Sequence, residues 1–509
     1  MYAKLFRHQP ATGAANRNIM AAACAATIVA GSLVGVGVAR ADAVGLDRFY
    51  RQQVDWRACG DEQLDAAGAR CADITVPLNY AEPQGRTITV AISRVAATDP
   101  GRRHGVLLSN PGGPGVAGLT FTVQAARSLG SGVRERFDLV GMDPRGVGRS
   151  TPLHCGWPIA SQLRSGGSDL IAYGKNVGTE AELAGRCLMT HGAEIPYITT
   201  RNTARDMDVI RGVLGEQRVS YLGGSYGTYL GAVFTQMFPE RVDRIVLDSV
   251  VDPARYPLGM LQDAGPANEA AFDLWAAWVA ARDGEYHMGT TGSAVRAAVT
   301  ELLRQAARAP IRIGDFAVDE YLLPSLLMDG IVDDQGYPEL AQGVRQLADA
   351  ATGMPVRPNP DLETSLRSGL RAEPMEYSAQ SMVFCGDVAA PRNPLWYWRN
   401  IEDSRATQPI FGSFVNNISP CAFWLPPVEE PTAVNNSVPA LILQATGDPR
   451  TVYQGGVALH RALTASRMVT LRDVVTHGVF LKSVCAARIA TGYLGDGALP
   501  AEDITCEAG

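Results

Sequence analysis

The sequence predicts an α/β fold, with a mostly parallel eight-stranded sheet and an inserted helical cap. Short, nearly continuous apolar runs recur along the chain and end in Gly, Pro, Asn or Asp. Such runs are typical of strands in a parallel sheet that is covered on both faces. Helical patterns lie between them, and this alternation indicates an α/β protein. The alternation stops between about residues 252 and 430, where a helix-rich segment with Pro-rich breaks replaces it.

Eight segments are expected to form the strands of the sheet. The first two read as a pair, and the last two follow the helix-rich segment. In chain order they are 73–80, 86–97, 106–109, 138–142, 219–222, 244–247, 440–445 and 468–474. Among the helices between them, one is expected to start at a capping-box-like sequence, Thr203 to Asp206, and to carry an apolar stripe that includes Met207 and Ile210.

The helix-rich segment, 252–430, is expected to cover the carboxyl edge of the sheet as a cap. Helical spacing places Trp275 and Val279 on one face of its first helix. The sheet domain is then expected to consist of two pieces, 42–251 and 431–509, which the cap interrupts.

Residues 1–41 have the pattern of a secretory signal peptide. Lys4, Arg7 and Arg17 precede an uncharged stretch rich in Ala, Val and Gly. The sequence Ala39-Arg40-Ala41 then offers small residues where a signal peptidase cleaves. An uncleaved anchor is the alternative, because the stretch approaches the ~20 residues that span a bilayer. We expect a secreted or envelope-associated protein without a stable membrane span after cleavage.

Eight cysteines follow this leader, an even number for a protein that is expected to meet an oxidising compartment. The alternative to disulfides is a set of buried free thiols. No two cysteines have the CxxC spacing that is typical of a zinc site, so no metal site is expected. The simplest pairing joins neighbours in sequence: Cys59–Cys71, Cys155–Cys187, Cys385–Cys421 and Cys485–Cys506.

The candidate nucleophile is Ser225, in the sequence Gly223-Gly224-Ser225-Tyr226-Gly227. This GxSxG motif follows an apolar strand and precedes a helical pattern. A tight strand-to-helix turn strains the serine and needs glycines around it, and it presents the hydroxyl at a helix N-terminus. The alternative is a structural Gly-rich turn.

A second Gly-rich loop, 110–115, follows the strand at 106–109. Its backbone can approach a substrate closely, and its amides can join that of Tyr226 in an oxyanion hole. We take Gly113 as the loop's donor, with Gly112 as the alternative and a plain turn as the other interpretation. The sequence Asp143-Pro144-Arg145 is expected to take part in a structural salt bridge, and bracing of the loop near the oxyanion hole is the alternative.

A serine nucleophile needs a base, and the base needs an acid that orients it. His477 follows the last predicted strand, and Asp448 follows the strand before it. The chain order Ser, Asp, His is that of α/β-hydrolases. Asp248, at the end of the strand 244–247, is the rival acid.

Taken together, these motifs resemble the tripeptidyl-aminopeptidase-like family of secreted actinobacterial α/β-hydrolases, which are related to proline iminopeptidases. The resemblance runs from about residue 50 to the end of the chain. Proline iminopeptidases usually have His where Asn110 stands, which favours the tripeptidyl-type branch. The matching stretches are 110–115, 142–150, 223–231, 247–253, 385–387 and 477–478.

The resemblance implies an exported hydrolase of peptide or ester bonds. We expect first an aminopeptidase that acts on short peptides, second a carboxylesterase, and third a cell-envelope binding protein that has kept the fold. An aminopeptidase must hold an ammonium group near the acyl pocket, and an unpaired buried charge is expensive. Asp387 and, more weakly, Glu269 are the candidate carboxylates; the alternative for each is a solvated surface acid.

No cofactor is expected, because the sequence has no Gly-rich phosphate motif and no metal-ligand cluster. The chain carries 45 Lys and Arg against 52 Asp and Glu, a formal net charge of -7. That mild acidity argues against a nucleic-acid partner, which would require clustered basic residues.

Overall fold

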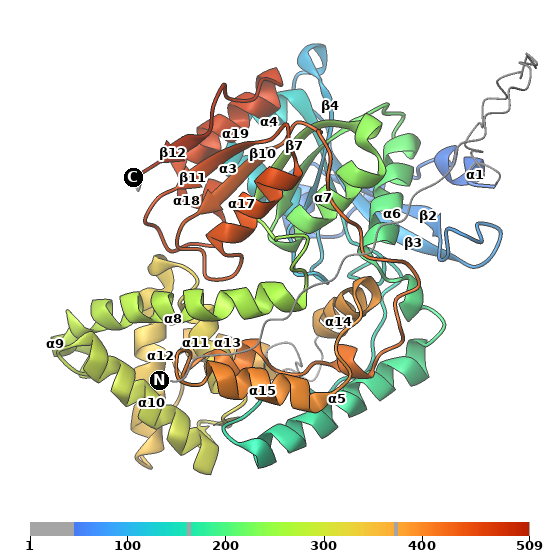
Figure 1. Ribbon diagram of the computed structural model, residues 1–509. Helices are drawn as coiled ribbons and strands as arrows, with labels where there is room; N and C mark the ends of the chain where they lie inside the picture. Colours follow the sequence, from blue (N-terminus) through green and yellow to red (C-terminus); the bar gives the residue numbers. More distant parts are fainter. Residues whose placement is uncertain (1–44, 160–163, 371–374, 508–509) are drawn as a thin grey trace, which may run out of the picture. The chain divides into compact units, whose positions relative to one another are not determined.

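A sheet of ten strands is the centre of the structure, a computed structural model that describes residues 45–159, 164–370 and 375–507 (Figure 1). The expected leader at 1–41 lies outside these residues. The strands lie in the order β1-β2-β3-β5-β4-β6-β7-β10-β11-β12. Their bounds are β1 (Arg57–Ala58), β2 (Arg70–Pro77), β3 (Thr87–Val95), β4 (Gly105–Asn110), β5 (Phe137–Met142), β6 (Val219–Gly224), β7 (Val242–Asp248), β10 (Leu441–Ala445), β11 (Arg467–Leu471) and β12 (Ile504–Cys506).

The sheet is mostly parallel, as the sequence predicts. From β5 to β12 all neighbours pair in parallel, and the antiparallel pairs are β1 with β2, β2 with β3 and β3 with β5. All eight predicted segments form strands of this sheet. The predicted number was too low, because two short strands, β1 and β12, extend the sheet at its edges.

Helices cover both faces of the sheet, and the strand periodicity explains why. In β4, Val106 and Leu108 belong to one buried apolar cluster, whereas Leu107 between them belongs to another. Successive side chains of a strand point to opposite faces, so one strand supplies both clusters. Helices of the first cluster include α6 (Thr200–Val213), α7 (Tyr226–Met237) and α17 (Tyr453–Ala462), and those of the second include α3 (Phe121–Leu129), α4 (Ser131–Arg136) and α19 (Val484–Asp496).

The helix expected to start at Thr203 begins earlier. Its N-cap is Thr199, whose side chain accepts a hydrogen bond from the Asn202 amide. Thr203 is therefore an interior residue, and its hydroxyl donates to the Thr199 carbonyl oxygen at 3.0 Å. The Thr-x-x-Asp sequence was thus an incorrect indicator of the N-terminus, since an earlier threonine satisfies the free amides of the first turn.

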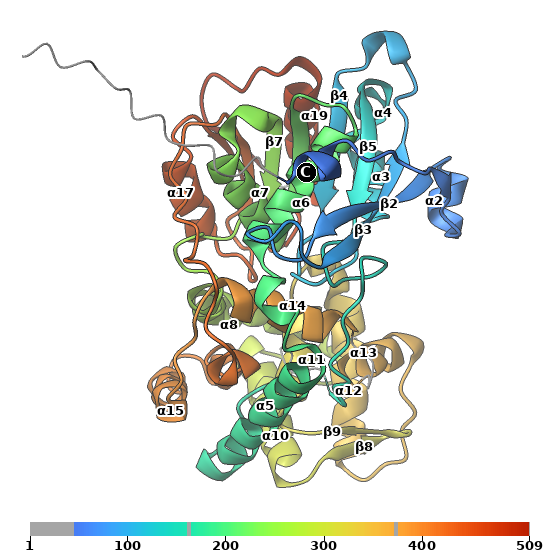
Figure 2. The same cartoon turned by 90° about the vertical axis from the view of Figure 1, so that its right-hand side faces the viewer.

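A helical layer lies beside the carboxyl end of the sheet, below it in Figures 1 and 2. A separate apolar cluster stabilises it, with Trp275 and Phe411 fully buried. It includes a short hairpin of β8 (Ile311–Ile313) and β9 (Phe316–Val318). The helices of the layer are α8 (Leu258–Ala280), α9 (Asp283–Tyr286), α10 (Gly292–Arg308), α11 (Leu323–Gly330), α12 (Tyr337–Ala351), α13 (Pro360–Leu370), α14 (Met375–Asp387), α15 (Pro394–Ser404) and α16 (Gly412–Val415).

One helix of this layer comes from outside the segment 252–430. Helix α5 (Leu170–His191) follows the sheet strand β5 in sequence, yet it lies among the cap helices in both views (Figures 1 and 2). The Tyr173 hydroxyl donates to the Pro394 carbonyl oxygen at 2.8 Å, and Asn176 Nδ2 donates to Asn417 Oδ1 at 2.8 Å. The cap therefore has two parts in sequence, one before and one after the nucleophile.

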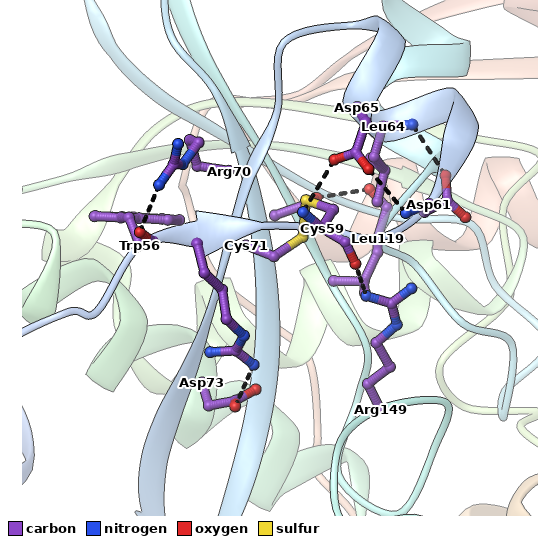
Figure 3. Close-up of a disulfide and its surroundings, with 12 residues drawn as sticks. Trp56, Cys59, Asp61, Leu64, Asp65, Arg70, Cys71, Asp73, Leu119 and Arg149 are labelled. Atoms are coloured by element: carbon purple, nitrogen blue, oxygen red, sulfur yellow. Dashed lines mark hydrogen bonds and ion pairs between the residues drawn. A yellow bond between two sulfur atoms is a disulfide. The ribbon is translucent and has the colours of Figure 1, made fainter.

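All four expected disulfides are present, which confirms the pairing of sequence neighbours. Cys59–Cys71 joins β1 to β2, and the Arg149 side chain donates to the Cys59 carbonyl oxygen beside it (Figure 3). Cys155–Cys187 anchors α5, and Cys385–Cys421 anchors the end of α14. Cys485–Cys506 ties α19 to β12.

Within residues 45–159, 164–370 and 375–507, no helix combines the length and the apolar character that a membrane crossing requires.

Candidate active site

Ser225 occupies a strained turn between β6 and α7. Its φ is 53° and its ψ is -126°, a conformation that a non-glycine residue rarely adopts. The neighbouring glycines are sterically required: a Cβ on Gly223 would lie 2.4 Å from the Gly227 carbonyl oxygen, and one on Gly227 would lie 2.5 Å from that of Asn110. The motif thus folds as the tight strand-to-helix turn that the sequence predicts.

The Gly-rich loop that follows β4 packs directly on this turn. A Cβ on Gly112 would lie 2.8 Å from the Ser225 Cβ and 3.2 Å from the Tyr226 amide nitrogen. The Gly112 amide donates to Asn110 Oδ1 at 3.0 Å, so this amide already has a partner. Of the two glycines considered as the loop's oxyanion donor, Gly113 is therefore the better candidate, together with the Tyr226 amide.

Asp143 supports the same loop, but not through Arg145. Its buried carboxylate accepts hydrogen bonds from the amides of Gly118 and Leu119 at 2.8 and 3.2 Å. Arg145 is fully buried and pairs instead with Asp206 at 2.6 Å. The expected structural salt bridge is therefore formed by Arg145 with Asp206, a residue distant in sequence, whereas Asp143 braces the loop through its amides.

His477 and Asp448 face each other across the ends of β11 and β10. His477 Nδ1 lies 2.9 Å from Asp448 Oδ2, and the Asp448 side chain is fully buried. The Asp448 carboxylate also accepts hydrogen bonds from the Arg450 and Thr451 amides, at 2.8 and 3.0 Å. With Nδ1 donating to the carboxylate, Nε2 is left as the basic nitrogen of the imidazole.

Thr451 is a site residue that the sequence interpretation missed. Its hydroxyl donates to Asp448 Oδ2 at 2.9 Å and lies 3.4 Å from His477 Nδ1. The signal was its position, three residues after the acid, where an aspartate side chain commonly binds the amides of its own turn.

Asp248, the rival acid, has a different set of partners. Its carboxylate accepts hydrogen bonds from the Val479 and Phe480 amides at 2.8 and 2.9 Å, and Ser249 Oγ lies 3.1 Å away. Burial raises the pKa of Asp248 to about 6. The residue therefore holds the loop that follows His477, whereas Asp448 contacts the imidazole itself.

The ends of the parallel strands bring these groups to one edge of the sheet. Ser225 follows β6, and β7 and β10 separate that strand from β11, which precedes His477. Ser225 and His477 are both partly exposed. Among the described residues, the Ser225 hydroxyl makes no hydrogen bond, so its contact with His477 is not formed in this structure. Catalytic hydrogen bonds often tighten only when substrate binds.

Asp387 is buried next to the residue that follows the nucleophile. Its carboxylate accepts hydrogen bonds from the Thr200 amide and hydroxyl, and from the Tyr256 hydroxyl at 3.2 Å. Thr200 Oγ1 in turn lies 2.7 Å from the Tyr226 hydroxyl. Burial raises the pKa of Asp387 to about 7. The Cys385–Cys421 disulfide anchors its helix, as the sequence predicts.

Glu269 does not belong to this site. One of its carboxylate oxygens accepts the amides of Ile410 and Phe411 at 2.8 and 3.0 Å, and the other pairs with Arg296 at 2.7 Å. Both oxygens already have partners inside the cap, which does not favour Glu269 as the carboxylate for a substrate ammonium. A carboxylate with these partners stabilises the cap.

Two cavities lie close to these residues. One, of about 680 Å³, lies between α8 and the loop after β10, where Asp448 and Thr451 line it. The other, of about 300 Å³, lies within the cap, and its walls include Tyr256, Phe384 and Trp396. Because Tyr256 also binds Asp387, the second cavity lies next to the hydrogen-bonded residues that connect Asp387 to Tyr226. Both volumes reach the range in which proteins bind small ligands.

Comparisons with known proteins agree with this geometry. A family model described as alpha/beta hydrolase fold matches residues 105–474. The tripeptidyl aminopeptidase of Streptomyces coelicolor is 34% identical over 92% of this chain and 88% of its own length. The serine protease Hip1 of Mycobacterium tuberculosis is 28% identical over 89% and 91%. Carboxylesterase B of Mycobacterium tuberculosis is 29% identical over 89% and 90%.

Proposed function

This chain belongs to the α/β-hydrolase fold family and is a hydrolase, and from that premise we propose that it is an exported serine aminopeptidase of the tripeptidyl type. The observation that carries the proposal is the His477–Asp448 hydrogen bond, at the same sheet edge as the strained Ser225 turn. A nucleophile, a base and a buried acid at one edge of the sheet are the parts that acyl transfer requires.

In the proposed mechanism, Ser225 attacks the carbonyl carbon of the substrate while His477 Nε2 accepts the hydroxyl proton. Asp448 holds the imidazole in the required tautomer and stabilises its charged form. The amides of Gly113 and Tyr226 bind the oxyanion. His477 then gives the proton to the leaving amine, and a water molecule hydrolyses the acyl-enzyme with His477 again as the base.

A preference for peptides with a free N-terminus is supported by the tripeptidyl aminopeptidase relative and by Asp387. An ammonium group entering a partly dry site needs a carboxylate nearby. Asp387 is buried within two hydrogen bonds of Tyr226, and its neighbour Tyr256 lines the cavity in the cap. We propose that a substrate ammonium binds on this side of the nucleophile and favours the ionised form of Asp387.

A carboxylesterase is the second candidate, because Carboxylesterase B is similar over most of both chains. The same triad and oxyanion hole would serve an ester. An esterase would be distinguished by a kcat/KM that does not depend on a free ammonium group in the substrate, since an acyl ester carries none.

Two measurements test the proposal. A fluorophosphonate probe should label the wild-type protein at Ser225 and should fail to label Ser225→Ala. Free and N-acetylated tripeptide amides should then be compared with short acyl esters. The aminopeptidase proposal expects the free peptides to have much the highest kcat/KM. Equal hydrolysis of free and acetylated peptides would reject it and leave the esterase.

Export is proposed from residues 1–41 and is supported by the four disulfides, which persist in oxidising compartments. We also propose that the exported protein associates with the cell envelope. N-terminal sequencing of the secreted protein tests the export proposal. A mature chain that starts at or near Asp42 is the expected result. A retained leader would instead indicate an anchor.

A further inference from the structure

The cap contacts the loop of the proposed base, His477. Val475, two residues before His477, belongs to the buried apolar cluster of the cap. Leu327 of α11 and Ile331, the first residue after it, belong to the same cluster and are fully buried, so the segment that connects α11 to α12 begins packed in the cap. A core loop that inserts an apolar side chain into the cap depends on the cap for its position.

Polar contacts fix the same loop from the cap side. Thr476, the residue before His477, donates its hydroxyl hydrogen to Asp333 Oδ2 at 2.7 Å. The other oxygen of Asp333 lies 2.9 Å from Lys482 Nζ, at the end of the short helix α18 (Val479–Lys482) that follows His477, and Lys482 also pairs with the neighbouring Asp334. Asp333 therefore binds the chain on both sides of the imidazole.

The loop of the acid, Asp448, is held by the cap in the same way. Asn268 of α8 is fully buried, and its Nδ2 donates to the Pro449 carbonyl oxygen at 2.7 Å. Arg450, two residues after Asp448, pairs with Asp329 and donates to the Met328 carbonyl oxygen. Asp329 and Asp333 lie four residues apart on one cap segment, so this segment connects the two loops.

The Asp333–Lys482 pair is partly shielded from water. Lys482 is 18% exposed and Asp333 is 28% exposed. Solvent and salt screen such a pair less than a fully exposed one. Asp333 is also the N-cap of a short helical turn, since it accepts a hydrogen bond from the Gln335 amide at 2.9 Å. This capping hydrogen bond orients the carboxylate toward Thr476 and Lys482.

We propose that Asp333 is a positioning residue for the reaction: the cap, through Asp333, holds the His477 loop in the place where the imidazole can serve both Ser225 and Asp448. This role rests on the proposed triad. A small displacement of a catalytic group is costly, because a misplacement of about 1 Å can lower the rate about 10²-fold. Catalysis in this protein therefore requires a docked cap, in addition to any role of the cap in choosing substrates.

The variant Asp333→Asn tests the proposal. Asparagine keeps one acceptor oxygen, which can cap the Gln335 amide or accept from Thr476 but cannot do both, and it removes one of the two carboxylates, Asp333 and Asp334, that pair with Lys482. We expect kcat to fall roughly tenfold, within the ~10²-fold that a misplaced group can cost, with KM changed less than about twofold. Labelling by a small fluorophosphonate should slow by the same factor as kcat, because the probe reports on Ser225 and His477 without a peptide in the site.

Glu363→Gln is the matched control. It neutralises another cap carboxylate that forms an ion pair, with Arg367, on the exposed side of α13. It should leave kcat and the labelling rate unchanged. A similar loss in both variants, or a normal labelling rate in folded Asp333→Asn, would overturn the positioning role.

Lys482→Met guards against a folding defect at Asp333, because it removes this ion pair from the core side, together with the pair that Lys482 forms with Asp334. It should lower kcat at least as much as Asp333→Asn does, and the double variant should lose little more than Lys482→Met alone. Additive losses would overturn the proposal. A wild-type protein that the probe does not label, or a labelled Ser225→Ala, would refute the proposed function and the positioning role with it. Labelling that depends on Ser225 but is insensitive to Asp333 and Lys482 would refute the positioning role alone.

Discussion

The backbone amide of Ser225 donates a hydrogen bond to the carbonyl oxygen of Asp248 at 2.9 Å. The Asp248 side chain meanwhile binds the amides of Val479 and Phe480, and the neighbouring Ser249 hydroxyl accepts from the Gly478 amide at 2.8 Å. One residue pair at the end of β7 therefore fixes both the turn of the candidate nucleophile and the loop of the candidate base. Asp248 therefore supports the candidate site through its hydrogen bonds to these two segments.

The two acids should respond differently to the same substitution. Asp448→Asn should lower kcat by about 10³–10⁴-fold, because the amide cannot hold the imidazole in the productive tautomer. Asp248→Asn should cost mainly stability, about 1–3 kcal/mol, since one amide hydrogen would face a backbone donor. Turnover and urea unfolding of both variants are the measurements. A larger loss of kcat in Asp248→Asn would identify Asp248 as the acid.

The nucleophile and the base should act as a unit. Ser225→Ala and His477→Ala should each lower kcat by several orders of magnitude, up to about 10⁶-fold, and the double variant should be no worse than either. Active-site titration of the wild-type protein, followed by single-turnover assays, measures the effect free of contaminating enzyme. Retention of a tenth of the activity by either variant would reject the assignment.

The sequence was sufficient for the sheet and for the turn at Ser225, because both depend on local patterns. Apolar runs located eight strands, and the glycines around Ser225 located the turn. The strands that were missed, β1 and β12, have two and three residues, too few for a period to emerge.

Local sequence patterns could not predict hydrogen-bond and ion-pair partners that are distant in sequence. Arg145 is only two residues from Asp143 in sequence but pairs with Asp206, 61 residues later. Glu269 lies on the buried side of α8, and only the packed structure brings Ile410 and Arg296 to it. Helix α5 looked like part of the sheet domain because its contacts with α15 depend on tertiary packing.

The Gly-rich loop should not tolerate a side chain at Gly112. A Cβ there would lie 2.7 Å from the Gly224 carbonyl oxygen and 2.8 Å from the Ser225 Cβ, and the φ of +113° is unfavourable for other residues. Gly112→Ala should therefore lower kcat by about 10²-fold or more through loss of oxyanion geometry. Gly132→Ala, where nothing lies within 4 Å of the new Cβ, is the control and should keep full activity. Equal activity of the two variants would show that the geometry of this loop does not contribute to catalysis.

Stability should fall as the pH rises through the range in which Asp387 titrates. Burial raises the pKa of Asp387 to about 7, whereas an unfolded aspartate has a pKa of about 3.9. Between these values the folded state binds a proton that the unfolded state has lost. The contribution of Asp387 to the free energy of unfolding is therefore complete below about pH 4 and is lost as the pH approaches 7. Asp248, with its pKa raised to about 6, contributes with the same sign.

Urea unfolding across this pH range measures the effect. Asp387→Asn should make the fall in the free energy of unfolding less steep, because the substituted side chain does not titrate. Glu502→Gln, at an exposed position, should leave the slope as it is in the wild-type protein. An unchanged slope in Asp387→Asn would mean that Asp387 does not titrate in this window.

The disulfide beside Asp387 should matter for substrate choice as well as for stability. Cys385–Cys421 fixes the end of α14, two residues before Asp387, whereas Cys485–Cys506 ties α19 to β12 at the sheet edge. Replacing either pair with alanines should lower the free energy of unfolding by about 2–5 kcal/mol, the cost typical of a lost native disulfide. Only the loss of Cys385–Cys421 should raise KM for peptides with a free N-terminus, because only that bond holds the proposed ammonium-binding carboxylate in place. Equal KM values for the two double variants, measured well below their unfolding temperatures, would contradict a role of Asp387 in substrate recognition.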